Sequence, residues 1–325
     1  MDNRTARTKE FASRIERGLI PAIPIPFDSQ GRIQEAAQEC HIRYLAQQPI
    51  AGVAVWVHTG RGLHLDRERR RSVLAAWRKG LPSNMVIVAG AGAPPALAAD
   101  YDAYVRAALE MAEDAFEGGA DALLVHPPRV ADITGYHRLL AGTGLPLLLF
   151  YLYEGAGGVS YSEATLRELL SLEATAGIKM ATLDSVLRYQ EVSRLLEEFP
   201  ERLLVTGEDR FFGYSFMRGA RAALVGMGAA CCRFFASMMK AWFDAGTRAG
   251  AADEFLKLSA QVDELAEAIF VAPMEGYIQR MLLVLAEQGI IPETATFDPW
   301  GPALNRAAER ARIRVTLQRL GLEHG

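Results

Sequence analysis

The chain has 325 residues, a formal net charge of −4 at pH 7, and 50% hydrophobic and 23% charged residues. This composition is typical of a globular protein with a large core, and the length suits one large barrel domain with an extension as well as two ordinary domains. Acidic and basic residues are interspersed, which argues against a surface for nucleic acid or for an anionic membrane. We expect neither partner.

The N-terminus and the cysteines bear on the compartment. The first 18 residues alternate charges and lack the apolar core of a signal peptide, and no apolar run approaches the ~20 residues of a membrane span. Cys40, Cys231 and Cys232 form an odd set that suits a reducing cytoplasm better than a disulfide framework. No spacing of Cys and His resembles a zinc site. We expect a cytoplasmic protein that needs no metal and no organic cofactor.

Short apolar and β-branched runs alternate with longer segments of helical spacing. The predicted strands are residues 19–25, 52–57, 85–89, 122–126, 146–151, 176–180, 203–206 and 222–226. The predicted helices between them are residues 34–47, 66–79, 100–117, 133–141, 162–170, 183–199 and 209–218. Apolar strands alternating with amphipathic helices indicate a parallel sheet covered by helices. Eight such strands, with no GxGxxG after the first, predict an α/β fold of the (β/α)₈ TIM-barrel type rather than an open dinucleotide-binding sheet.

After residue 228 the strand pattern ends, and residues 234–245, 254–271 and 275–288 have helical spacing. We predict three parts: an N-terminal helical segment over 1–18, the barrel over 19–248, and a C-terminal helical extension over 249–325. We expect the extension to pack against the barrel and to take part in assembly.

Catalytic groups of such barrels lie at the C-terminal ends of the strands. Lys179 is the only charge in the predicted sixth strand, where both faces should be buried. A strand-end lysine can simply pair with an acid such as Glu208. Alternatively, burial lowers the lysine pKa, so that its free amine can attack a carbonyl.

An amine that attacks a carbonyl needs a proton shuttle within hydrogen-bond reach. Tyr151, at the end of the neighbouring fifth strand, can supply a phenol or can be an ordinary core aromatic. The turn from His58 through Thr59 and Gly60 offers a hydroxyl and backbone N–H groups that suit a carboxylate, although such turns are also common in loops.

These residues, in order, resemble the dihydrodipicolinate synthase/N-acetylneuraminate lyase family, whose members are class I aldolase-like barrels acting on 2-oxo acids. Residues 23–27 are similar to its strand-1 T-P-F segment, 52–62 to the strand ending in G-[ST]-T-G-E, 177–180 to the G-I-K segment, 206–209 to s-G-d-D, and 219–228 to G-a-x-G-x-I-S. The resemblance covers residues 19–228. It implies Lys179 as the Schiff-base residue and Tyr151 as the shuttle. The residues it implies for substrate binding are Thr59, Gly60, Gly207, Leu224 and Val225.

Three positions depart from the family pattern. His58 replaces a hydroxyl residue of the proton relay, so it either assists the shuttle or packs. Counting forward from Leu145 puts Phe150 at the tyrosine position, whereas counting back from Lys179 puts Tyr151 there. We favour Tyr151, with Tyr153 as a further candidate. Ala156 stands where the synthase branch has an arginine.

The resemblance therefore predicts a lyase (EC 4 class) that acts on a small pyruvate-type 2-oxo acid through a Lys179 imine, and not the lysine-biosynthesis synthase. The resemblance leaves two reactions open: an aldolase, which breaks a carbon–carbon bond, and a dehydratase of a deoxy sugar acid, which breaks a carbon–oxygen bond. The loops at the barrel mouth carry three charged residues that could contact the part of the substrate remote from the 2-oxo acid group: Arg61, Arg129 and Glu154. The family also implies a homo-oligomer, a tetramer or a dimer.

Two other interpretations remain. A homologue that binds a 2-oxo acid without turnover would fit if Phe150 rather than Tyr151 faces Lys179. A metal-dependent barrel enzyme would use strand-end residues such as His58, His126, Glu208 and Asp209, although no established ligand spacing links them.

Overall fold

The computed structural model describes residues 3–324 of the chain and contains one eight-stranded parallel sheet. The strand order is β1-β8-β7-β6-β5-β4-β3-β2, and a bridge between Ala22 and Ala54 brings the two end strands together. The strands are β1 (Leu19–Pro21), β2 (Gly52–Val55), β3 (Val86–Ala91), β4 (Ala122–Val125), β5 (Leu147–Leu152), β6 (Thr175–Ala181), β7 (Leu203–Thr206) and β8 (Ala222–Val225). The predicted barrel is confirmed.

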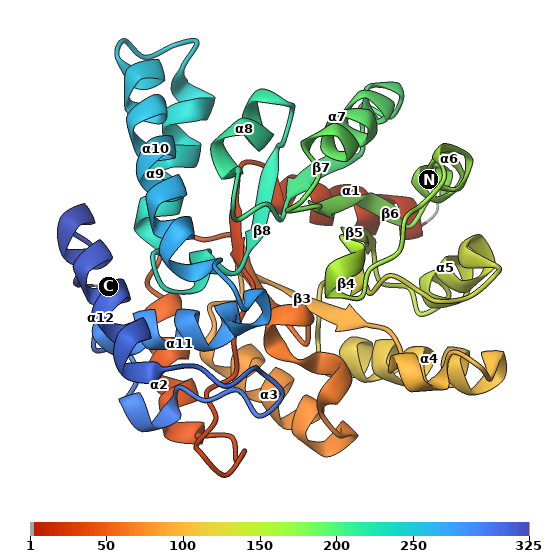
Figure 1. Ribbon diagram of the computed structural model, residues 1–325. Helices are drawn as coiled ribbons and strands as arrows, with labels where there is room; N and C mark the ends of the chain where they lie inside the picture. Colours follow the sequence, from red (N-terminus) through yellow and green to blue (C-terminus); the bar gives the residue numbers. More distant parts are fainter. Residues whose placement is uncertain (1–2, 325) are drawn as a thin grey trace.

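Helices follow the strands and surround them (Figure 1). The barrel helices are α2 (Glu35–Leu45), α3 (Arg67–Gly80), α4 (Tyr101–Glu117), α5 (Ile133–Ala141), α6 (Glu163–Ser171), α7 (Val186–Leu195), α8 (Phe212–Met217) and α9 (Cys232–Asp244). Outside this repeat lie α1 (Asn3–Ile15), α10 (Ala251–Ile269), α11 (Tyr277–Glu287) and α12 (Arg306–Leu320). Residues 1 and 2 of the predicted N-terminal segment lie outside the described part of the chain.

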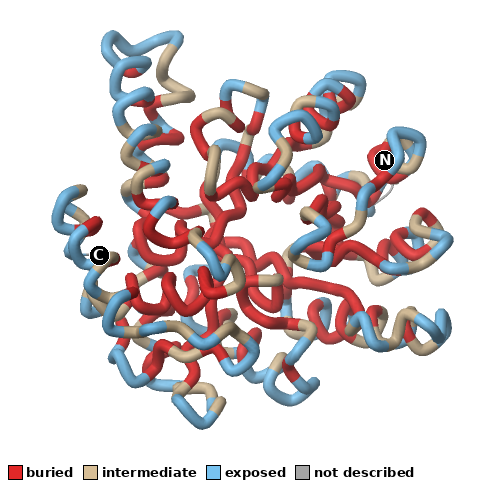
Figure 2. The backbone as a smooth tube through the Cα atoms, viewed as in Figure 1, coloured by how far each residue is buried: buried red, intermediate tan, exposed pale blue. Residues whose placement is uncertain are grey.

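The barrel interior is filled with side chains, and the residues at its centre are buried (Figure 2). Alternate strand residues such as Val88, Leu148 and Val205 point inward and form one apolar cluster. Phe11 and Ile15 of α1 belong to the same cluster, so α1 closes the N-terminal end of the barrel. The free space of the barrel is therefore at its C-terminal end, where βα loops gather.

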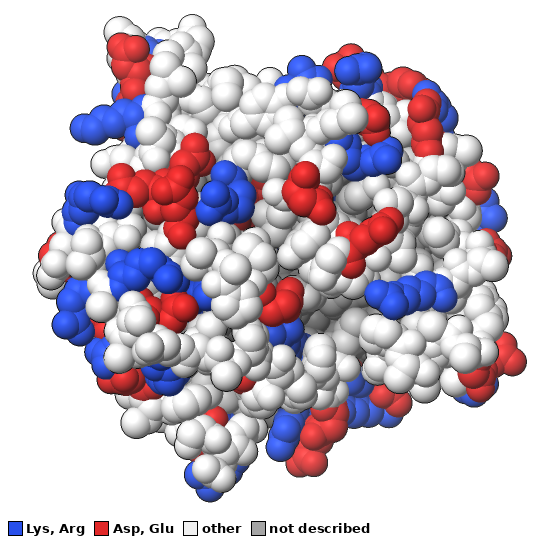
Figure 3. Space-filling view, viewed as in Figure 1, with Lys and Arg blue, Asp and Glu red and all other residues white. Residues whose placement is uncertain are grey.

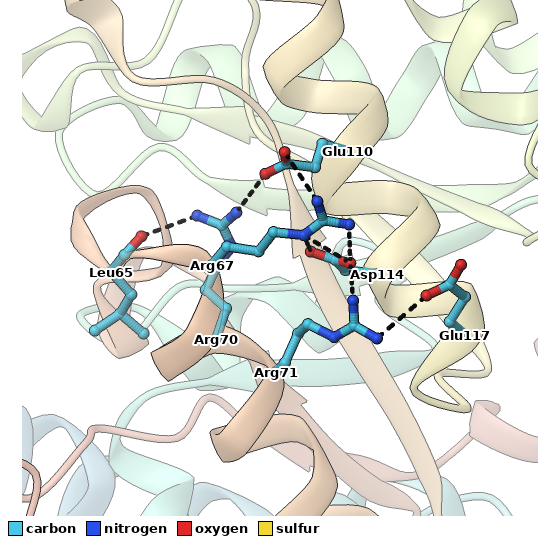
Figure 4. Close-up of polar contacts among 7 residues, drawn as sticks. All are labelled: Leu65, Arg67, Arg70, Arg71, Glu110, Asp114 and Glu117. Atoms are coloured by element: carbon cyan, nitrogen blue, oxygen red, sulfur yellow. Dashed lines mark hydrogen bonds and ion pairs between the residues drawn. The ribbon is translucent and has the colours of Figure 1, made fainter.

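Ion pairs fix neighbouring barrel helices to one another (Figure 4). Asp114 of α4 is buried and accepts hydrogen bonds from Arg67 of α3 at 2.8 and 2.9 Å. Arg70 of α3 reaches Glu110 at 3.2 Å and the Leu65 carbonyl at 2.9 Å. Such pairs hold the loops after β2 and β3 in place, and the first of these loops belongs to the site described below.

The C-terminal helices complete the molecule on the side of the barrel mouth. Helix α11 is buried along most of its length and passes over the ends of β2 and β8. At β8 it comes so close that a Cβ on Gly226 would lie 2.8 Å from Met281 Sδ. At β2 it contacts His58 and Thr59 through Tyr277. The extension therefore contributes to the mouth itself and not only to its surroundings.

The surface carries charges of both signs, which alternate around the face shown in Figure 3. Within residues 3–324 no single helix is long and apolar enough to span a bilayer. By length and composition, α10 passes that test only together with the segment Met274–Glu287, as a pair bent by 105°.

Candidate active site

Lys179 points from β6 into a pocket at the C-terminal end of the barrel. Its side chain is 7% exposed, and the pocket encloses about 460 Å³ including its open mouth. Polar groups from three other parts of the chain meet Lys179 there: His58 and Thr59 after β2, Asp209 after β7, and Glu275 and Tyr277 from the C-terminal extension. The barrel topology thus brings together residues that are more than 200 positions apart.

The environment of Lys179 favours a neutral amine more than water does. Burial lowers the pKa of Lys179 to about 8, although the nearby Asp209 and Glu208 carboxylates oppose this effect. Its Nζ lies 4.3 Å from the centre of the Phe150 ring. The ion pairs among residues 3–324 do not include Lys179. The amine therefore remains available for attack on a carbonyl.

Glu208 and Asp209 have structural partners of their own. Glu208 accepts hydrogen bonds from the Thr182 N–H at 2.6 Å, the Thr182 hydroxyl at 2.8 Å and the Leu183 N–H at 2.9 Å. Asp209 accepts one from the Met227 N–H at 3.1 Å. Glu208 thus connects β7 to the end of β6. It does not form the ion pair with Lys179 that was the simpler of the two sequence interpretations.

The fifth strand presents Phe150, and not Tyr151, to Lys179. The register between β5 and β6 shifts after Leu147, so that Phe150 pairs with Lys179 and both side chains point inward. Tyr151 points outward into the layer between barrel and helices, where it packs edge-on against Tyr161. Its hydroxyl is buried without a hydrogen-bond partner. The geometry thus corrects the expectation that the Tyr151 phenol lies beside the lysine.

Two other tyrosines do line the pocket: Tyr153, the further candidate, which follows β5, and Tyr277, which sequence reasoning missed. Tyr277 lies at the start of α11 and its hydroxyl is 2.9 Å from His58 Nδ1 and 3.2 Å from Thr59 Oγ1. His58 Nε2 lies 3.8 Å from Glu275 Oε2. The sequence offers no local signal for these contacts, because Tyr277 and Glu275 belong to a helical segment that nothing in the pattern attaches to the mouth.

The predicted turn after β2 forms a short 3₁₀ segment, His58–Gly60. Thr59 is buried and lines the pocket, as expected of a carboxylate donor. The Gly60 N–H donates to the Val57 carbonyl at 2.9 Å. This backbone donor, which we expected to bind the carboxylate, therefore already has a partner within the turn. The strand leads into this turn through Trp56, whose φ of +59° is the left-handed conformation.

Among the other predicted binding residues, Gly207 lies where expected. A Cβ at this position would be 2.4 Å from Lys179 Cε, so only glycine leaves room for the lysine side chain. Leu224 points into the barrel core below the pocket and Val225 points outward, because successive strand residues alternate. At this strand end it is Gly226 that lines the pocket.

The two predicted mouth arginines lie apart from the lysine. Arg61 is buried with Nη2 2.6 Å from Asp298 Oδ2 and Nη1 3.3 Å from Glu275 Oε2, so its charge is already neutralised. Arg129 is on the β4–α5 loop and donates to the Gly157 carbonyl at 3.4 Å. Glu154 accepts from Ser160 at 2.7 Å on the outer side of the same region.

The part of the chain that the structure describes contains no cluster of three or more His, Cys, Asp or Glu side chains arranged to hold a metal ion. His126 donates from Nε2 to the Trp56 carbonyl at 3.1 Å, which ties the ends of β4 and β2 together.

Comparison with known proteins places this geometry in a family. The sequence profile of the dihydrodipicolinate synthetase family matches residues 16–318. The chain belongs to this family. Its match takes in the barrel and also α10, α11 and most of α12, so the helices at the mouth are part of the family's fold.

Curated relatives in this family are similar over most of the chain. A probable mitochondrial 4-hydroxy-2-oxoglutarate aldolase of Emericella nidulans is 25% identical over 81% of this chain and 84% of its own length. An uncharacterized DapA-like lyase of Chloroflexus aurantiacus is 28% identical over 94% and 97%. These relatives are named as lyases or aldolases.

Solved structures agree on the fold. Dihydrodipicolinate synthase from Oceanobacillus iheyensis superposes with a TM-score of 0.80 at 17% identity, covering 97% of this chain and 99% of that one. The sialic acid aldolase of Ruminococcus gnavus gives 0.77 at 17% identity, covering 94% and 99%. A dihydrodipicolinic acid synthase family protein of E. coli K12, solved in complex with pyruvate, gives 0.80 at 19% identity over 94% and 98%.

Proposed function

We propose that the chain is an aldolase-type lyase that acts on a small 2-oxo acid through a Schiff base on Lys179. The observation that carries this proposal is the lysine itself: the only charged residue of β6, buried, directed into the pocket, and with a pKa lowered to about 8. A buried amine with a lowered pKa is the nucleophile that carbonyl chemistry of this kind requires.

The chemistry follows from the amine. The neutral Lys179 nitrogen attacks C2 of the oxo acid, the carbonyl oxygen leaves as water, and a protonated imine remains. The hydroxyl on C4 then loses its proton, the C3–C4 bond breaks, and its electron pair passes to this cation, which gives an enamine and a released aldehyde. Reprotonation of the enamine carbon and hydrolysis of the imine return the amine and release the 2-oxo acid.

The rest of the pocket supports a small substrate. The Thr59 hydroxyl is the donor for the carboxylate. Ala156 lines the pocket where the synthase branch has an arginine, which supports a substrate other than that of lysine biosynthesis. With Arg61 neutralised by Asp298 and Arg129 outside the pocket, the substrate tail meets apolar walls such as Phe270 and Met274. The protein would work in the cytoplasm, as a homo-oligomer, without a metal or organic cofactor.

Two alternatives share the same pocket. A dehydratase of a deoxy sugar acid would use the same imine and expel a hydroxyl instead of an aldehyde. A homologue that binds a 2-oxo acid without turnover is favoured by one observation, the phenyl ring of Phe150 at the position where a phenol was expected.

The test is borohydride trapping. Wild-type protein and Lys179→Ala are incubated with pyruvate and a panel of 2-oxo acids, reduced, and mapped by peptide mass. We expect an adduct on the peptide that contains Lys179, and none in Lys179→Ala. Folded wild-type protein without an adduct from any panel member would overturn the proposal.

A second measurement separates a catalyst from a binder. Formation of the enamine exchanges the methyl hydrogens of pyruvate with solvent, so NMR in D₂O should show deuterium incorporation that depends on Lys179. An adduct without exchange would favour the non-catalytic alternative.

A further inference from the structure

The site needs a proton donor and acceptor that β5 does not supply. When the amine attacks, a proton must leave the nitrogen and the carbonyl oxygen must gain protons before it departs as water. The group that β5 places against Lys179 is the Phe150 ring, which exchanges no proton. The Tyr151 hydroxyl lies on the other side of the strand. Tyr153, directly after β5, also lines the pocket, but the hydrogen bonds among residues 3–324 do not include its hydroxyl.

Tyr277 places in this pocket a phenol that neighbouring polar side chains hold in position. Its hydroxyl lies in the same pocket as Lys179 and is held by two contacts, to His58 Nδ1 at 2.9 Å and Thr59 Oγ1 at 3.2 Å. Its ring is fixed by stacking on Phe270, with centroids 4.9 Å apart, and lies parallel to the His58 ring at 6.1 Å. The phenol is therefore ordered before substrate arrives.

The charge states suit a donor. Burial raises the pKa of Tyr277, so the phenol carries its proton at neutral pH. Burial, together with the nearby Arg61, lowers the pKa of His58 to about 3, so the imidazole is neutral and can accept a hydrogen bond at one nitrogen. Glu275 lies on the far side of His58, at the mouth, with 38% of its side chain exposed.

We propose that Tyr277 is the acid–base residue of this site, positioned by His58 and Thr59, and that it takes the role left vacant by Phe150. The inference rests on the imine function proposed above. It assigns a catalytic part to the C-terminal extension.

The protons balance as follows. The neutral amine brings two protons, of which one stays in the protonated imine. Tyr277 takes the other from the nitrogen as it gives its own to the former carbonyl oxygen. A second proton from solvent completes the departing water. Before substrate binds, His58 with its proton on Nε2 accepts the hydrogen bond of the phenol at Nδ1, which orients the Tyr277 hydroxyl.

The experiment measures the rate of deuterium exchange into pyruvate and the rate of borohydride-trapped adduct at Lys179. Tyr277→Phe keeps the stacked ring and removes only the hydroxyl. We expect both rates to fall on the order of 100-fold, since positioned acid–base groups contribute this much or more. The amount of adduct after long incubation should match wild type.

Tyr151→Phe is the matched control, because it removes a buried tyrosine hydroxyl on the outer face of β5. It should leave both rates unchanged. Phe150→Tyr combined with Tyr277→Phe should recover part of the lost rate, since it restores a phenol beside Lys179, and a merely structural loss would not respond in this way.

The outcomes separate the two proposals. Wild type without adduct would overturn the imine function and this inference with it. An adduct in wild type, with Tyr277→Phe exchanging as fast as wild type, would overturn only the role of Tyr277. Loss of rate in Tyr151→Phe alone would assign the role to Tyr151.

Discussion

Two opposing effects act on the charge of Lys179. Removal from water favours the neutral amine and lowers its pKa. The face of the Phe150 ring, 4.3 Å from Nζ, attracts the ammonium form, as do the Asp209 and Glu208 carboxylates. The first effect is larger, but the others keep the amine close to its protonation midpoint near neutral pH. A nucleophile that also receives protons benefits from such a position.

Gly207 gives a prediction at the scale of single atoms. A methyl group at this position would lie 2.4 Å from Lys179 Cε and 2.9 Å from the Met180 carbonyl oxygen. We expect Gly207→Ala to displace the lysine side chain and slow adduct formation on the order of 100-fold, the cost of misplacing a reacting group by about 1 Å. Borohydride trapping with pyruvate measures it.

Gly246→Ala serves as the control for this change, because a Cβ there meets open space. It should trap pyruvate at the wild-type rate. A Gly207→Ala protein that folds and traps as fast as wild type would show that the lysine does not need this space.

At the scale of elements, a buried arginine holds the segment that covers the pocket. We call residues 270–277 the roof segment, since Phe270, Met274, Glu275 and Tyr277 line the pocket from it. Arg280 of α11 is fully buried and donates to the carbonyls of Ile269, Val271 and Pro273 at 3.1, 2.7 and 3.1 Å. Its Nε donates to Glu309 of α12 at 2.9 Å.

We therefore expect Arg280→Met to lower the free energy of unfolding by about 3–5 kcal/mol, because it leaves Glu309 and several carbonyls without their buried partner. Urea denaturation measures the change. Arg314→Met removes an arginine with 55% of its side chain exposed from an ion pair with Glu287 and should cost less than about 1 kcal/mol. Equal effects of the two changes would contradict the role of Arg280.

The strands show what sequence can and cannot predict. Lys179 stands out in β6 because it is the only charged residue of a strand that is buried throughout, where it needs either an acidic partner or a function. In β5 every residue from Leu147 to Leu152 is apolar or aromatic, and both faces of the strand are buried. With no polar alternation, the sequence does not tell which residues point inward.

The register decides the question for β5. If Leu147 and Thr175 paired and the strands then ran on in step, Tyr151 would stand opposite Lys179. The shift after Leu147 moves Phe150 into that place. A one-residue irregularity in β6 thus places Phe150 rather than Tyr151 opposite Lys179, and nothing in the local sequence predicts this irregularity. Tyr277 escaped prediction for a related reason, since only tertiary packing brings α11 to the ends of β2 and β8.

At the scale of the whole molecule, three buried histidines link stability to pH. His41, His126 and His137 each donate one ring N–H to a backbone carbonyl, of Ala229, Trp56 and Ile133 respectively. Burial lowers the pKa of each to about 4, against 6.5 as the ordinary value. Between pH 6.5 and 4 these three histidines therefore bind protons in the unfolded chain but not in the folded one. Burial raises the pKa of Glu208 to about 7 and that of Asp209 to about 6, so these two carboxyls act in the opposite direction and offset part of the effect.

We expect the free energy of unfolding to be highest above pH 7 and to fall as the pH is lowered toward 4, with each histidine contributing at most about 1.4 kcal/mol per pH unit. Urea titrations at pH 7.5 and 5 measure this. His324→Gln, a change at an exposed residue, should not alter the slope. The same unfolding free energy at both pH values would contradict the prediction.

The dependence of the roof segment on α12 has a consequence for biosynthesis. A ribosome that has produced residues 1–250 has made every strand, Lys179 and Thr59, yet Tyr277 does not exist at that point and Glu309, which holds Arg280, is made later still. A nascent or prematurely terminated chain can therefore present the reactive amine without its cover. We expect such fragments to be chemically exposed at Lys179, and the complete pocket to be a property of the finished polypeptide.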